Sequence, residues 1–171
     1  MQARWFTSAE TTRAVEMLLG RTPAGAFSVV AYGPSGEPLV LHNAPFLRDG
    51  TPMPTSYWLL SSELFREVGR LESAGGVREA ERELDPAVVA GTHSRAALER
   101  VADVEWFHRS YPLVSTRGVP SGGVGGTRRG VKCLHAHVAH ELAGRDDVVG
   151  RWALARIGES FAPSAGGVRE Q

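Results

Sequence analysis

FSVVAYGPSGEPLVLH, residues 27–42, decides the fold, because two apolar runs rich in β-branched and aromatic residues flank a turn. The runs 27–32 and 38–42 have the length and composition of strands. Between them, GPSGE provides glycine and proline where the chain must reverse direction. The stretch therefore predicts an antiparallel hairpin.

The rest of the chain predicts a third strand and several helices around this hairpin. Residues 43–56 (NAPFLRDGTPMPTS) are rich in proline and turn residues, which predicts an irregular loop. YWLL at 57–60 predicts the third strand, and Ser8 is placed to cap a helix ending near Gly20. Helices are also expected over 61–74, 77–84, 86–107, 130–143 and 149–157, with a loop over 109–129. We therefore expect an α+β fold, a small antiparallel sheet packed against several helices.

Length and composition favour one small globular domain. The chain has 171 residues, of which 42% are hydrophobic and 22% charged, values typical of a folded domain. We expect that domain over residues 1–157 and a flexible tail over 158–171. The formal net charge is zero, which argues against a nucleic-acid or membrane partner. One cysteine permits no internal disulfide, and no apolar run approaches the roughly 20 residues of a membrane span, so we expect a cytoplasmic protein.

The segment SGGVGGTRRGVKCLHAHVAHEL, residues 121–142, is the expected site of chemistry. It holds the only cysteine, Cys133, the only lysine, Lys132, and three of the six histidines. Residues 109–140 contain four arginines and the lysine but no acidic residue. This uneven charge predicts a local binding site for an anion.

The glycines before Cys133 predict a cradle for that anion. If a helix begins near Gly130, its first-turn amides are unpaired and attract negative charge. Glycine also allows backbone N–H groups to approach a ligand closely, as in phosphate-binding loops. We expect a small, phosphorylated ligand, with a solvated flexible loop as the alternative. The expected ligand-binding residues are Gly122, Gly123, Gly125, Gly126, Arg128, Arg129 and Lys132, flanked by Asn43, Asp49 and Thr51.

Cys133 also has the surroundings of a nucleophile. In the first turn of a helix and beside cations, its thiolate would be favoured. His137 lies four residues further on the same helix face, which permits a Cys–His pair. The catalytic candidates are Cys133, His137 and His135, with either histidine as general acid or base. The alternative is a small buried cysteine without chemistry.

A metal site is a further alternative. Cys133, His137 and His140 lie at positions i, i+4 and i+7, so they share one helical stripe. Zinc accepts such sulfur and nitrogen ligands, provided another segment completes the site. The alternative for each histidine is a structural hydrogen bond.

Three stretches resemble one family. NAPFLRDGTPMPTSYWL, GGTRRGVKCLHAHVAHELAG and the trailing VGRW resemble the bacterial domain of unknown function 501 family, in matching order over about residues 12–157. The resemblance implies a small bacterial cytosolic protein of actinobacterial type. It also suggests neighbouring genes for an exopolyphosphatase-like enzyme and a septum-formation initiator. It implies no known reaction, so no catalytic residue is carried over.

We therefore expect a protein that binds a small anionic ligand and acts on it as a hydrolase or transferase. One alternative is a non-catalytic interaction protein in a cell-division or phosphate-stress complex, which would have a protein partner. The other is a metal-binding protein or metal-dependent hydrolase that uses Cys133 and His137.

Overall fold

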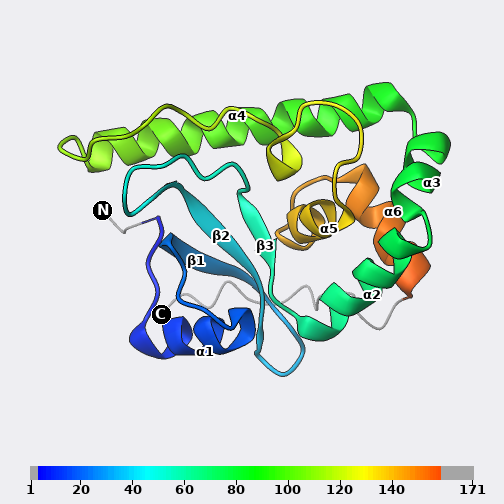
Figure 1. Ribbon diagram of the computed structural model, residues 1–171, viewed down its shortest axis with the longest axis horizontal. Coiled ribbons are helices and arrows are strands. Elements are labelled where there is room, and N and C mark those ends of the chain that lie inside the picture. Colours follow the sequence, from blue (N-terminus) through cyan, green and yellow to red (C-terminus); the bar gives the residue numbers. More distant parts are fainter. Residues whose placement is uncertain (1–3, 159–171) are drawn as a thin grey trace.

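The computed structural model describes residues 4–158 and shows an α+β fold, which confirms the predicted class (Figure 1). The elements in chain order are α1 (Ala9–Leu19), β1 (Gly25–Tyr32), β2 (Pro38–Leu47), β3 (Tyr57–Leu59), α2 (Ser62–Ser73), α3 (Gly76–Glu83), α4 (Pro86–Ser110), the short 3₁₀ helix η1 (Val124–Gly126), α5 (Leu134–Leu142) and α6 (Val148–Ile157).

The predicted hairpin forms the sheet together with the predicted third strand. β1 pairs with β2 and β2 pairs with β3, both antiparallel, so the strand order is β1-β2-β3. His42 of β2 lies opposite Tyr57 of β3, and their rings stack with centroids 4.8 Å apart. The sheet thus carries polar aromatic side chains at the start of β3.

β2 is longer than predicted, because residues 43–47 continue the strand instead of forming an irregular loop. The backbone N–H of Asn43 donates to Ser56 O, which keeps the chain extended beyond His42. Pro45 is tolerated because the β1–β2 register shifts at this point, and proline is accommodated at such irregularities.

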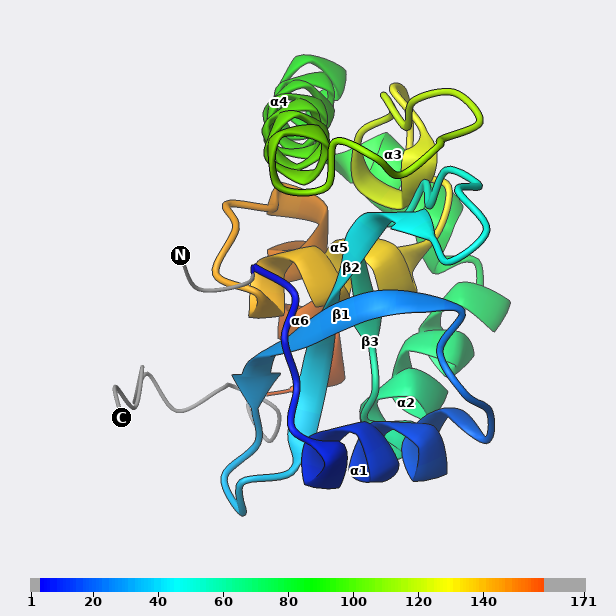
Figure 2. The same cartoon turned by 90° about the vertical axis from the view of Figure 1, so that its left-hand side faces the viewer.

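Helices pack on both faces of the sheet (Figure 2). On one face, Val15 of α1 meets Phe27 and Leu41 in a small apolar cluster. On the other face, a larger core joins β2 and β3 to helices α2 to α6 and includes Leu64, Leu134 and Val149. α5 lies between β3 and α6 within this core (Figure 1).

α5 begins four residues later than predicted, at Leu134 rather than at Gly130. Gly130 has a φ of 63°, a left-handed conformation that interrupts a right-handed helix, and Cys133 is extended. Carboxylates from other helices hold the preceding backbone, since Glu81 accepts the N–H of Val131 and Glu72 accepts that of Leu134. The residue that starts this helix is therefore fixed by distant acids.

Arg100 of α4 anchors the segment after β2. Its guanidinium is 1% exposed and donates to the carbonyl oxygens of Asn43, Ala44 and Met53. Asp103, one turn further along α4, lies 3.6 Å from the same guanidinium. This buried arginine satisfies backbone groups that would otherwise lack partners.

None of the helices between residues 4 and 158 combines the length and the apolar character that a bilayer crossing requires. The tail predicted over 158–171 lies outside the described residues from position 159 onward.

Candidate functional site

The histidines of α5 point to two different surroundings. His137 and His140 are buried, 1% and 4% exposed, whereas His135 is half-buried. His135 approaches α2, with its Nε2 2.9 Å from Phe65 O. One short helix therefore contributes to two separate polar clusters.

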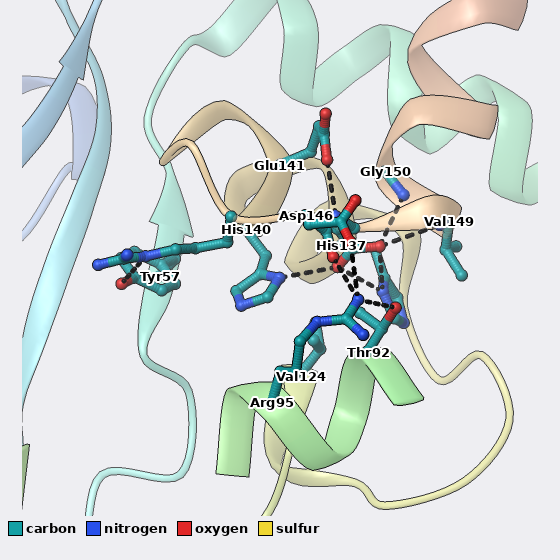
Figure 3. A network of polar contacts seen from close by, with 12 residues as sticks. Tyr57, Thr92, Arg95, Val124, His137, His140, Glu141, Asp146, Val149 and Gly150 are labelled. Atoms are coloured by element: carbon teal, nitrogen blue, oxygen red, sulfur yellow. Dashed lines mark hydrogen bonds and ion pairs between the residues drawn. The ribbon is translucent and has the colours of Figure 1, made fainter. Parts of the chain in front are cut away.

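Asp147 is the centre of the buried cluster, because its carboxylate meets His137 and His140 of α5 and the first turn of α6. Figure 3 shows the two histidines beside Val149 and Gly150 of that turn. Asp147 precedes α6 and caps it, with Oδ1 accepting the N–H groups of Val149 at 3.0 Å and Gly150 at 2.9 Å. Its Oδ2 lies 2.9 Å from His137 Nδ1 and 3.0 Å from His140 Nδ1. A fully buried carboxylate thus receives four hydrogen bonds.

These hydrogen bonds keep Asp147 ionised. Burial alone would raise the pKa of Asp147, but the bonds from His137 and His140 outweigh it and hold the pKa well below the usual 3.8. An ionised carboxylate only accepts hydrogen bonds, so both histidines carry a proton on Nδ1. In a neutral imidazole, the Nε2 atom of either histidine therefore carries a lone pair and no proton.

His140 lines a small cavity. The cavity has a volume of about 10 Å³, and Tyr57, Glu99 and Gly125 line it together with His140. His140 Nε2 and Glu99 Oε2 are buried, lie 4.0 Å apart and have no hydrogen-bond partner among the described residues. Arg145 contacts two of the lining residues, donating to the Tyr57 hydroxyl at 3.0 Å and lying 3.5 Å from Glu99 Oε2. The remaining lining residues are Thr55, Ser56, Ala96, Gly123, Val124 and Ala136.

His93 of α4 ties the glycine loop to this cluster. Its Nε2 lies 2.8 Å from Gly130 O, and its Nδ1 accepts the N–H of Val124 at 3.2 Å. A carbonyl oxygen only accepts, so Nε2 carries the proton and both ring nitrogens are engaged. Burial lowers the pKa of His93, which favours this neutral form. Gly123 packs so close to His93 that an added Cβ would lie 2.7 Å from the His93 Cβ.

The predicted anion cradle has internal partners for several of its amides. Gly123 N–H donates to Thr127 O, Gly126 N–H to Gly123 O, and Val124 N–H to His93. At the start of α5, the Glu72 carboxylate occupies the place expected for a free anion. Arg128, Arg129 and Lys132 are exposed, and Arg128 donates to Ser121.

The flanking residues predicted to bind ligand make local hydrogen bonds. Asn43 is buried in β2, and its side-chain amide donates to Thr55 O at 3.1 Å. Asp49 Oδ1 accepts the N–H of Thr51 at 2.9 Å, which is an Asx turn. That hydrogen bond also lowers the pKa of Asp49.

Cys133 is placed beside His135 rather than His137. Cys133 Sγ lies 3.8 Å from His135 Nδ1, and Glu72 Oε2 lies 3.3 Å from the same nitrogen. The predicted pairing with His137 assumed that Cys133 belongs to the helix. Because Cys133 is extended and precedes α5, the i, i+4 relation does not hold.

For the same reason, the structure does not bring Cys133, His137 and His140 together as metal ligands. A different group of possible metal ligands does come together: Glu72, Cys133 and His135, whose ligand atoms all lie within 4.8 Å of one another. It is the only such group of three cysteine, histidine or acidic residues within residues 4–158.

Sequence reasoning missed three residues of these clusters: Asp147, Glu99 and Glu72. Asp147 had a usable signal, since an acid directly before the apolar run VVGRWAL is a helix cap. Glu99 and Glu72 lie on helices of a highly charged region, and no local pattern distinguishes them from solvent-exposed acids.

Comparison with known proteins gives one finding. Residues 29–155 match the family described as Protein of unknown function (DUF501), which covers most of the chain. No curated protein and no solved structure matches the chain.

Proposed function

We propose that this chain, which belongs to the family described as Protein of unknown function (DUF501), is a hydrolase whose general base is His140. One observation carries the proposal: His140 lines the cavity, donates through Nδ1 to the ionised Asp147, and has an unpartnered Nε2 lone pair 4.0 Å from Glu99, which lines the same cavity. An imidazole that a buried carboxylate orients in this way can take the proton of an attacking nucleophile.

The size of the cavity fits the nucleophile rather than the substrate. A volume of about 10 Å³ is close to the minimum for one water molecule. His140 Nε2 and Glu99 Oε2 both accept hydrogen bonds, and their 4.0 Å separation leaves room for one water to donate to each. His140 would remove one proton as the water oxygen attacks and return it to the leaving group.

A small anion remains the expected class of substrate. It would approach past Thr55 and Gly125, which line the cavity and are only half-buried. Arg145 contacts the lining residues Tyr57 and Glu99 and carries positive charge that can balance a developing oxyanion. The exposed cations Arg129 and Lys132 support the same preference.

The test compares the wild type with His140→Gln on chromogenic phosphomonoesters, phosphodiesters and carboxylic esters. We expect turnover of one class, with kcat/KM about 10²- to 10⁴-fold lower in the variant, the usual contribution of a general base. His108→Gln, at an exposed position of α4, is the matched control and should stay within twofold of the wild type. Absence of turnover in every class, or an unchanged His140→Gln, would contradict the proposal.

A readout without substrate tests the same observation. ¹⁵N chemical shifts of the imidazole nitrogens distinguish the two neutral tautomers directly. We expect the proton of neutral His140 on Nδ1, and in Asp147→Asn a shift toward Nε2. A proton on Nε2 of neutral His140 in the wild type would leave no lone pair there to act as general base, and would contradict the proposal.

A further inference from the structure

We propose that Glu72, Cys133 and His135 form a binding site for one zinc ion, at the junction of α2 and α5. The site is independent of the proposed hydrolytic function, because none of its three residues lines the cavity at His140. It also differs from the zinc site predicted from the sequence, since only Cys133 belongs to both.

Two of the three separations among the ligand atoms are close to those around a tetrahedral ion. Zinc bonds are about 2.3 Å long to sulfur and about 2.0–2.2 Å long to nitrogen and oxygen. At tetrahedral angles, a nitrogen ligand then lies about 3.6 Å from a sulfur ligand and about 3.4 Å from an oxygen ligand. The corresponding separations are 3.8 Å from Cys133 Sγ to His135 Nδ1 and 3.3 Å from His135 Nδ1 to Glu72 Oε2. Both separations are within about 0.2 Å of the tetrahedral values, and the third pair, Cys133 Sγ and Glu72 Oε2, lies within 4.8 Å.

The orientation of His135 is already that of a metal ligand. Its Nε2 lies 2.9 Å from Phe65 O, and a carbonyl oxygen can only accept, so Nε2 carries a proton. His135 Nδ1, on the other side of the ring, is then the atom that faces Cys133 and Glu72. A backbone carbonyl that holds the far nitrogen is the usual outer-shell partner of a zinc-bound histidine.

The second ligand, Glu72, is also held in place by the protein. Its Oε1 accepts the N–H of Leu134 at 2.6 Å, which leaves Oε2 directed toward His135. Two of the three ligands are thus fixed by backbone groups without the ion. Zinc binds the thiolate form of cysteine, so its binding would release the proton of the Cys133 thiol to solvent.

The donor set and the exposure favour an accessible zinc site with one position open. Thiolate, imidazole and carboxylate together suit zinc better than magnesium or calcium, which prefer oxygen alone. The side chains of His135 and Glu72 are 15% and 27% exposed, and Cys133 is half-buried, so an ion can enter. Three protein ligands leave the fourth position for water or another small ligand.

The experiment uses the full chain, expressed without a histidine tag. Zinc content is measured by plasma mass spectrometry after dialysis, and Co²⁺ is titrated into the metal-free protein while absorption is followed. We expect about one equivalent of metal per chain and a sulfur-to-cobalt charge-transfer band, because Cys133 is the only cysteine. Less than one tenth of an equivalent, or a cobalt spectrum without that band, would overturn the proposal.

Substitutions identify the ligands. Cys133→Ser should abolish the charge-transfer band. His135→Gln should weaken zinc binding by at least ~10- to 100-fold, because removal of even an outer-shell partner of a ligand has an effect of that size. Glu72→Gln keeps an oxygen for the Leu134 amide, so it tests coordination without uncapping α5.

Glu67→Gln, on the same helix α2, and His108→Gln are the matched controls and should bind metal like the wild type. Circular dichroism confirms that each variant is folded. Folded Cys133→Ser and His135→Gln variants that bind zinc like the wild type would refute the assignment.

Discussion

Replacement of Asp147 by alanine should destabilise the protein by about 4 kcal/mol. The carboxylate is fully buried and accepts four hydrogen bonds, two from the first turn of α6 and two from the imidazoles of α5. Loss of a helix cap costs about 1 kcal/mol. Each buried imidazole donor left without its acceptor costs about 1.5 kcal/mol. The total is large against the roughly 5–15 kcal/mol that stabilises a typical domain.

The assay is urea unfolding at neutral pH, followed by tryptophan fluorescence. Asp146→Ala is the matched control, because its side chain is 67% exposed and pairs with arginines only at the surface. We expect the control to lose less than about 1 kcal/mol. An Asp147→Ala protein that loses no more than Asp146→Ala would refute the view that Asp147 organises the α5–α6 core.

The effect of Asp147 should also depend on pH. Its pKa is depressed in the folded protein, so its stabilising contribution is complete above its unfolded pKa, near 4, and declines as the pH falls toward the native pKa. The difference in unfolding free energy between wild type and Asp147→Ala should therefore shrink as the pH is lowered from 5 to 3. A difference that stays constant over this range would contradict an ionised Asp147.

Two glycines should respond to alanine in opposite directions. Gly150→Ala should destabilise by about 2 kcal/mol, because the new Cβ would lie 2.4 Å from His137 O and force α5 and α6 apart. Gly91→Ala, within α4, meets only Arg95 Nη1 at 3.5 Å and should stabilise by up to about 1 kcal/mol through helix propensity. Arg100→Met should lower the unfolding free energy by about 3 kcal/mol, since three buried carbonyl oxygens lose their donor. Thermal unfolding measures all three, and a neutral Arg100→Met would show that water replaces the guanidinium.

The sheet was predictable because its signals are local. Apolar runs of strand length around a glycine–proline turn specify the hairpin within 16 residues, and the helices α1, α2 and α4 begin at Ser and Asp caps that the sequence displays. The extension of β2 was not predictable, because it depends on pairing of Asn43 with Ser56 across an intervening turn.

The candidate site was predictable in its location but not in its pairings. The histidines of residues 133–140 do form polar clusters, yet their partners come from elsewhere. His137 and His140 meet Asp147 after the next turn, and His135 meets Glu72 from α2. The error of four residues at the start of α5 also changed which histidine accompanies Cys133. An error of four residues is ordinary for the start of a helix, but here it decides which histidine lies beside the Cys133 thiol.

The two glutamates that hold the chain before and at the start of α5 have an evolutionary consequence. Glu81 and Glu72 bind the N–H groups of Val131 and Leu134, so the boundary of α5 is set by residues at least 50 positions earlier. A nine-residue helix is too short to be stable in isolation. Among relatives, position 72 should therefore carry a side chain that can accept a hydrogen bond, unless a change near position 134 supplies another cap, and this covariation would be visible in an alignment of the family.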